Sequence, residues 1–278
     1  MTRQEKRRKA IINRMVTRLV LILVLLLGVV IWLMARSDEQ NDPVTETTLA
    51  TAAQEETTTA TEPPTEAELP SETEPDLSGI PESLLELMER NPETTEFVLN
   101  YPYRQELGFD LSAVNREAGV PLFLQWDMRW GYTIYGTDVM ALTGCGPTCM
   151  AMAGYYLTGD EKFTPNQMTK FAEESGYYAW GNGTAWSFFA DGAEELGLQS
   201  KELTLMKSSI VDQLEKGRLV VLVVGPGDFT EHGHYLLVVG YEDGMFRIND
   251  PNSIIRSETL WSYERLEPQI RNLWAIWA

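Results

Sequence analysis

Residues 144–148, Gly-Cys-Gly-Pro-Thr, place a thiol where a loop turns into a helix. Residues 148–157 have helix-compatible spacing, with a proline suited to the first turn and Gly159 suited to the end. Cys145 would then face the free N–H groups and the positive end of a buried helix, which favours the thiolate. The pentapeptide alone fits a small apolar core cysteine equally well.

A hairpin further along the chain carries a histidine and an aspartate near its open end. The apolar run at residues 233–241 indicates a strand buried on both faces, opened by His234. Turn residues follow, and residues 245–249 indicate the returning strand, which leads into Asp250. A titratable side chain at the start of such an apolar strand indicates a role beyond packing.

The register of this hairpin decides whether the two side chains can meet. With a strict two-residue loop, Asp250 lies opposite Leu237 and its side chain leaves the face opposite to that of His234. A three-residue loop or one bulge moves Asp250 opposite Leu236, which makes it a same-face diagonal neighbour of His234. We therefore predict an odd-length connection.

Four motifs follow one another in a characteristic order. They are Gln-Trp-Asp-Met-Arg-Trp at 125–130, Gly-Cys-Gly-Pro-Thr at 144–148, Gly-His-Tyr at 233–235 with Gly-Tyr at 240–241, and Asn-Asp-Pro at 249–251. In this order they resemble the motifs of the C39-like family of papain-fold cysteine peptidases. The likeness covers roughly residues 80–278, including a stretch at 80–103 similar to one found ahead of the catalytic core in exported members. The sequence shows no transporter region, so the leader-peptide substrate of the transporter-fused members is not expected.

The resemblance implies a Cys-His-Asp triad of Cys145, His234 and Asp250, with Gln125 helping to form the oxyanion hole. The chemistry asks for the same residue types: a thiolate attacks an acyl carbon, an imidazole moves the proton, and a carboxylate fixes the ring tautomer. The backbone N–H of Cys145 and the Gln125 amide are candidate oxyanion donors. We expect a cysteine peptidase that acts through a thioester, without a metal or cofactor.

The expected substrate contacts lie in these motifs and in an aromatic stretch at residues 177–189. They are Trp126, Gly144, Trp180, Gly183 and Gly233. The aromatic stretch is interrupted by Gly-Asn-Gly-Thr at 181–184, so it fits either the wall of a substrate groove or a packed core with a glycine loop.

Other residues leave alternatives open. His232 and His234 would share a face in an extended strand and could bind a metal, although the preceding loop favours a turn. Cys149, one helical turn after the first thiol, is expected in the core. Asp127 and Asp228 are alternative partners for the imidazole. A metal-dependent hydrolase, an inactive peptide-binding module and an acyl transferase are therefore competing hypotheses.

The N-terminal residues predict where the domain is held. Residues 1–18 are strongly basic, and residues 19–35 contain no charge and are long enough to span a bilayer. The basic excess before the span predicts a cytoplasmic N-terminus, and the absence of an Ala-x-Ala-like site favours an uncleaved anchor. Residues 36–79, rich in Thr, Glu and Pro, predict a disordered extracytoplasmic linker.

Residues 80–278 are long enough for one sizeable core. Apolar spacing predicts helices at 81–90, 164–175, 184–196 and 208–216, and a central strand at 219–224. Helices followed by strands indicate an α+β domain, with the thiol-bearing helix packed against an antiparallel sheet.

The distribution of charge along the chain limits the classes of molecule that it is expected to bind. The formal charge of −19 combines about +7 in residues 1–36 with about −26 in the rest. No basic face for nucleic acid is visible, and a neutral or basic peptide is the more natural partner. Two cysteines in an exported chain provide no disulfide framework, which suits a reactive thiol.

Overall fold

The computed structural model describes residues 75–105, 107–181 and 183–278. Residues 77–278 form one compact unit. The predicted basic tail, the predicted span at 19–35 and nearly all of the predicted linker lie outside the described residues. Among the residues that are described, no helix combines the length and apolar character needed to cross a bilayer.

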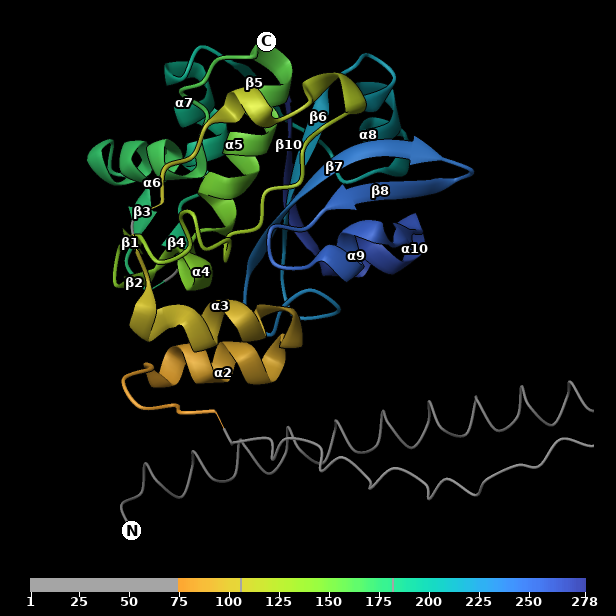
Figure 1. Ribbon diagram of the computed structural model, residues 1–278. Coiled ribbons are helices and arrows are strands. Elements are labelled where there is room, and N and C mark those ends of the chain that lie inside the picture. The colour runs from red at the N-terminus through yellow and green to blue at the C-terminus, as the bar shows by residue number, and fades with distance from the viewer. Residues whose placement is uncertain (1–74, 106, 182) are drawn as a thin grey trace, which may run out of the picture. The chain divides into compact units, whose positions relative to one another are not determined.

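A six-stranded sheet, antiparallel throughout, lies at the centre of the described domain (Figure 1). In spatial order its strands are β5 (Gln199–Glu202), β10 (Ile270–Trp277), β6 (Leu219–Val224), β7 (His234–Glu242), β8 (Met245–Asn249) and β9 (Leu260–Trp261). The apolar run of β6 has its predicted bounds and is buried at every position. It therefore occupies a central place, as predicted.

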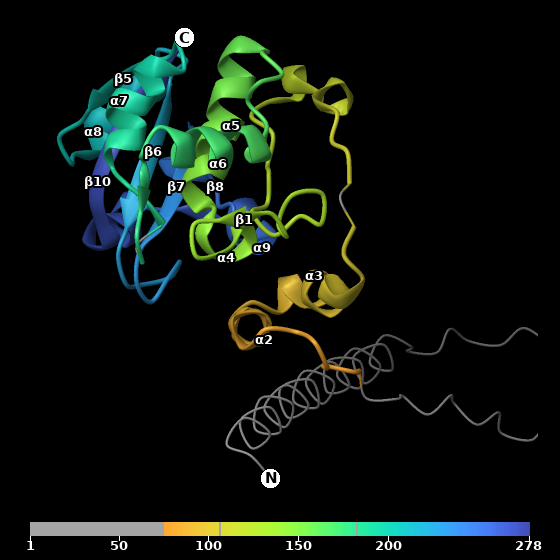
Figure 2. The ribbon, with the colours of Figure 1, turned by 90° about the vertical axis from the view of Figure 1, so that its left-hand side faces the viewer.

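Helices cover both faces of this sheet (Figures 1 and 2). One face packs against α5 (Cys145–Thr158), α6 (Pro165–Glu174) and α7 (Ser187–Glu195), and the other packs against α8 (Lys207–Leu214) and α10 (Tyr263–Leu266). Alternate residues of β6 point to opposite faces of the sheet. Val221 and Val223 lie in the core on the α5 side, whereas Val220 and Leu222 lie in the core on the α8 side. This is the α+β arrangement that the order of elements predicted.

Two short hairpins flank the start of α5. They pair β1 (Ile134–Tyr135) with β2 (Asp138–Val139), and β3 (Tyr178–Ala179) with β4 (Gly183–Thr184). The other described elements are α4 (Met140–Thr143), α9 (Ile254–Glu258), η4 (Leu111–Ala113), η5 (Arg116–Ala118) and η6 (Glu267–Gln269).

The β3–β4 hairpin explains one wrong prediction. The helix expected at 184–196 begins only at Ser187, because Thr184 pairs with Tyr178 across the hairpin. The helices expected at 81–90, 164–175 and 208–216 are present with ends shifted by at most two residues.

A helical layer precedes these elements. It consists of α2 (Glu82–Arg90), η2 (Pro92–Thr94), α3 (Thr95–Asn100) and η3 (Tyr101–Tyr103). Its apolar side chains are buried, namely Leu84, Leu85, Leu87, Met88, Phe97 and Val98. Phe97 stacks on Tyr132 with ring centroids 4.2 Å apart, and the Tyr132 hydroxyl donates to the Phe97 carbonyl at 2.8 Å. The layer is therefore fastened to the loop that leads toward α4.

Candidate active site

Cys145 is the first residue of α5, as the loop-to-helix pattern predicted. Thr148 fixes this first turn by donating both its backbone N–H and its hydroxyl to the Gly144 carbonyl. Gly159 ends the helix in the left-handed conformation, at φ 72°. Cys145 is partly exposed and stands at the helix end where N–H groups lack intrahelical partners. A thiolate there would face a positive field.

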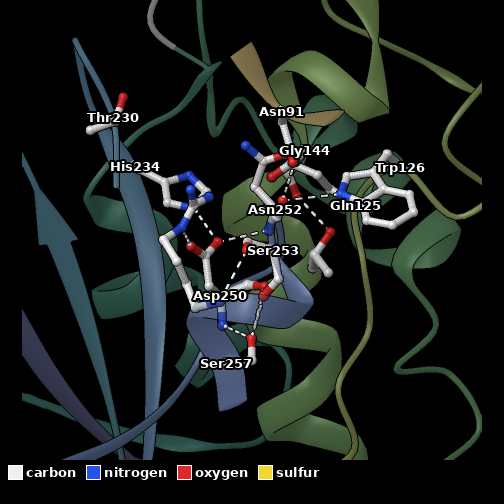
Figure 3. Close-up of polar contacts among 12 residues, drawn as sticks. Asn91, Gln125, Trp126, Gly144, Thr230, His234, Asp250, Asn252, Ser253 and Ser257 are labelled. Atoms are coloured by element: carbon white, nitrogen blue, oxygen red, sulfur yellow. Dashed lines mark hydrogen bonds and ion pairs between the residues drawn. The ribbon is translucent and has the colours of Figure 1, made fainter. Parts of the chain in front are cut away.

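His234 opens β7 and is buried, with 6% of its surface exposed. Its Nε2 lies 2.7 Å from Oδ1 of Asp250 (Figure 3). Cys145 lies near enough to this ring to raise its pKa. Because Nε2 is occupied by the carboxylate, Nδ1 is the ring nitrogen left for the thiol. The structure thus brings together three of the residues that the sequence had singled out.

The register that permits this contact arises from a bulge. The loop between β7 and β8 has two residues, Asp243 and Gly244, both with positive φ. The loop is thus not three residues long, and the predicted register has to come from the other alternative, a bulge. The pairing shifts by one residue between Val238 and Gly240, so that Leu237 pairs with Asn249. This bulge, the second of the two alternatives, brings Asp250 to the side of His234.

Asp250 is fully buried and each carboxylate oxygen is engaged. Oδ1 also accepts from the backbone N–H of Asn252 at 2.7 Å, and Oδ2 accepts from Nε of Arg256 at 2.5 Å. Burial would raise the pKa of this carboxyl, but the charges and hydrogen bonds of His234 and Arg256 lower it below its usual range. Asp250 is therefore held as a carboxylate.

The pKa of His234 is moved in the opposite direction. Burial alone would lower it, but the charge and hydrogen bond of Asp250, followed by the influence of Cys145, raise it to about 10. The ring is thus protonated at neutral pH and lies between two groups that carry negative charge when ionised. That is the arrangement of an imidazolium prepared to give a proton to a leaving group.

Gln125 lies beside this site with its side chain buried. Its backbone N–H donates to the Pro251 carbonyl at 2.7 Å, and Nε2 donates to the Ala141 carbonyl at 2.6 Å. An amide nitrogen carries two hydrogens, so one remains for a ligand. Oε1 is buried and has no hydrogen-bond partner within the described part of the chain.

The comparison with protein families gives one match. Residues 117–277 match the Peptidase_C39 like family. The chain belongs to this family.

Two solved structures resemble this C39-like domain. The peptidase domain of Streptococcus ComA, described as a bifunctional ABC transporter involved in quorum sensing, is 21% identical and aligns with a TM-score of 0.38 over 52% of this chain and 96% of that one. A putative C39-like peptidase from Bacillus anthracis is 16% identical, with a TM-score of 0.39 over 57% and 94%. No curated protein matches the chain. The family assignment rests on the match to residues 117–277.

The expected substrate positions of the C39-like domain fall into two groups. Gly144 is buried, and Trp126 is half-buried and tied to the framework, because its indole donates to the Asn252 carbonyl at 3.1 Å. Trp180, Gly183 and Gly233 are at least partly accessible, and Trp180 is 79% exposed. The accessible group is the better placed to meet a ligand.

The aromatic stretch divides in the same way. Tyr177, Phe188 and Phe189 are buried in the core, whereas Trp180 and Trp186 are exposed. Both hypotheses for this stretch therefore apply, each to different residues.

The alternative partners for the site lie elsewhere in the C39-like domain. His232 is exposed in the loop before β7, and its N–H donates to the Thr230 hydroxyl, as the predicted turn requires. Asp127 pairs with Arg129. Asp228 pairs with Arg265. Among the described residues no group of three or more His, Cys, Asp or Glu side chains is arranged to hold a metal ion, so the metal-dependent alternative finds no ligand set there.

Cys149 is a core residue, as expected. It is fully buried, and burial raises the pKa of its thiol well above the usual value. Both cysteines are free. The two thiols of α5 thus differ sharply in accessibility.

Sequence reasoning missed the residues that support Asp250. These are Arg256, Ser257 and Asn252, which bind its side chain or its backbone. One signal was present: Ser253 is an N-cap residue, with its hydroxyl accepting from Arg256 N–H at 3.1 Å. A short helix predicted from that cap would have placed residues 256 and 257 next to Asp250.

Proposed function

We propose that this chain is a cysteine peptidase that hydrolyses peptide or related amide bonds through a thioester at Cys145. The observation that carries the proposal is the position of His234. Its buried ring is hydrogen-bonded to Asp250 and lies near enough to Cys145 for that residue to raise its pKa, within a domain of the C39-like family. Nucleophile, base and orienting group in one chain of contacts are what acyl transfer from an amide requires.

In the first half of the reaction, the Cys145 thiolate bonds to the carbonyl carbon of the substrate. The C–N bond then breaks, and the proton on Nδ1 of His234 passes to the leaving amine. Asp250 holds the ring by Nε2, so that Nδ1 stays directed at the sulfur and the departing nitrogen. The products of this half are a free amine, an acyl thioester and a neutral imidazole.

In the second half, the neutral imidazole accepts a proton from water while the oxygen of that water bonds to the acyl carbon. The C–S bond breaks, the thiolate returns and the carboxylic acid leaves. The Gln125 amide and the backbone N–H of Cys145 are the proposed donors to the negative oxygen in both halves. An amine in place of water would give acyl transfer by the same residues.

The peptide is proposed to lie against the β3–β4 hairpin. A Cβ added to Gly183 would come 3.4 Å from the Thr143 carbonyl, and one added to Gly146 would lie 2.6 Å from Oγ1 of Thr184. The hairpin therefore approaches the α4–α5 junction closely, and it presents the exposed Trp180. An extended peptide with an apolar side chain fits such a surface.

We further propose that residues 19–35 anchor the chain in the cell membrane and that the peptidase domain is extracytoplasmic. The uncharged run and the basic residues before it support this arrangement. Protease added to intact cells should degrade the domain of the full-length chain. A variant lacking residues 1–36 should remain in the soluble fraction. Protection of the domain from the added protease would contradict the orientation.

A peptide carrying an electrophilic carbonyl tests the enzyme itself. Full-length protein in detergent is expected to form a covalent adduct at Cys145, mapped by mass spectrometry, and to lose it in Cys145→Ala and His234→Ala. Cys149→Ala is the matched control and should retain the adduct, because that thiol is buried. The proposal would be refuted if the wild-type protein formed no adduct. It would also be refuted if the Cys145→Ala variant still cleaved peptides. Comparing new N-termini in cells with wild-type protein and with Cys145→Ala would then identify the substrate.

A further inference from the structure

The helical layer at residues 82–103 precedes the family match at 117–277. It nevertheless contacts the loop that follows Asp250. Asn91 lies between α2 and η2, and its Nδ2 donates to the Asn252 carbonyl at 2.6 Å (Figure 3). The indole of Trp126 donates to the same carbonyl. Both acceptor positions of this carbonyl are therefore filled, one by the layer and one by the C39-like domain.

Glu93 provides the stronger contact. One carboxylate oxygen accepts a short hydrogen bond from the Ser253 hydroxyl, and the other accepts from the backbone N–H groups of Ile254 and Ile255 at 2.7 and 3.3 Å. These are the first N–H groups of α9, which have no partners within the helix. A carboxylate from a distant segment thus caps α9 and complements its positive end.

Glu93 is itself held in place. Its backbone N–H donates to Oδ1 of Asn91 at 3.2 Å. Asn91 is buried, and its own carbonyl accepts from the Thr94 hydroxyl at 2.7 Å. The two layer residues that reach the Asp250 loop therefore form one fixed unit.

The capped helix is the element that holds Asp250. α9 supplies Arg256, which binds the carboxylate, and Ser257, whose hydroxyl accepts from the Asp250 backbone N–H at 2.8 Å. A helix of five residues has little stability of its own, since helix formation needs about twelve residues or more in isolation. Its position must come from tertiary contacts, among them the cap from Glu93.

We infer that Glu93 and Asn91 are positioning residues for the catalytic carboxylate: they fix α9 and the Asp250 loop, and through Asp250 they fix the orientation of the His234 ring. This inference rests on the proposed function. It also assigns a role to the layer at 82–103, which is then a working part of the peptidase site. The effect is transmitted through Asp250, so it should appear in the proton-transfer chemistry and leave substrate binding unchanged.

The test uses the full-length chain with Glu93→Gln, Glu93→Ala and Asn91→Ala. The matched control is Glu86→Gln, an exposed position on α2. We expect kcat to fall about five- to tenfold in Glu93→Ala, because a displaced α9 misplaces Asp250, with KM unchanged and with a smaller fall in Glu93→Gln. Glu86→Gln should match the wild type. If Glu93→Ala does not fold, Glu93→Gln carries the test.

A double-mutant cycle separates positioning from general destabilisation. In an Asp250→Asn background, Glu93→Gln should change kcat by less than about twofold, because the group through which Glu93 acts is already altered. Additive losses in the double variant, or an unchanged kcat in both Glu93 variants, would overturn the inference.

A second readout does not depend on peptide turnover. The rate at which iodoacetamide alkylates Cys145, followed across pH 5 to 9, reports the ionisation of the thiol beside His234. We expect Glu93→Ala to shift this profile toward higher pH and Glu86→Gln to leave it in place. If Cys145→Ala retained activity, the proposed function would fail while the alkylation profile still decided the positioning role. An unshifted profile in Glu93→Ala would count against that role.

Discussion

Cys145 and Asp250 are held by contacts of very different range. Cys145 starts α5, and its first turn is fixed by Thr148 four residues from Gly144. Asp250 is held by α9, whose first turn is capped by Glu93 from 160 positions earlier in the chain. The proposed nucleophile is thus positioned locally, whereas the carboxylate of Asp250 depends on a segment outside the family match. The two halves of the site should therefore respond differently to distant changes.

The largest expected effect belongs to the local half. Cys145→Ala and His234→Ala should each lower kcat by at least about 10⁴-fold, because the two act as a unit in bond breaking. Cys149→Ala should cost only about 1 kcal/mol of stability and leave kcat near the wild-type value. Steady-state kinetics on a cleaved peptide measure all three. Near-normal turnover in His234→Ala would separate the imidazole from the reaction.

Gln125→Ala should have the next largest effect. Loss of an oxyanion donor lowers kcat by about 10²- to 10³-fold with little change in KM. Gln125 also donates its backbone N–H to Pro251, and this contact survives the substitution, so the Asp250 loop should stay in place. An unchanged kcat would remove Gln125 from the oxyanion hole.

The pH dependence of stability tests the contact between His234 and Asp250, where the two halves meet. The pKa of His234 is raised in the folded state to about 10, so its contribution is fully present below about pH 6.5 and is lost as the pH rises through about 10. The pKa of Asp250 is lowered, so its contribution is present above about pH 4 and is lost as the pH falls through the folded value.

The free energy of unfolding, measured with urea, should therefore fall by about a few kcal/mol between pH 7 and pH 10, as the raised pKa of His234 requires. His234→Gln removes the titrating ring and should flatten this part of the curve. A wild-type curve that is already flat from pH 7 to pH 10 would contradict a protonated ring between Cys145 and Asp250.

The smallest expected effect lies outside both halves. Trp180→Ala should raise KM for a peptide with an apolar side chain by about five- to tenfold and leave kcat unchanged, since it removes a binding surface. Trp186→Ala, another exposed tryptophan, is the comparison. Equal effects of the two substitutions would argue against a specific role of the β3–β4 hairpin.

The local half of the site could be predicted from the sequence because it depends on short-range patterns. The helix of Cys145 and the strand of His234 depend on spacing and apolarity within about ten residues, and both appear as predicted. The register of Asp250 could be narrowed to two alternatives, but the choice of a bulge at Val239 over a longer loop depends on packing of the whole sheet.

The supports of Asp250 could not be predicted in the same way. Glu93 and Asn91 meet their partners only after the chain has folded, and nothing in the spacing around them points to residues 252–255. The same limit explains the late start of α7, where pairing of Thr184 across a hairpin outweighs its place in a helical pattern.

A ¹⁵N NMR titration of the histidine rings measures whether His234 is protonated between Cys145 and Asp250. The chain contains two histidines, so His232→Gln assigns the signals. We expect His234 to stay protonated at both nitrogens up to about pH 10, and Cys145→Ala and Asp250→Asn each to lower the midpoint of its titration. A His234 ring that loses its proton at or below about pH 6.5 in the wild type would contradict this expectation.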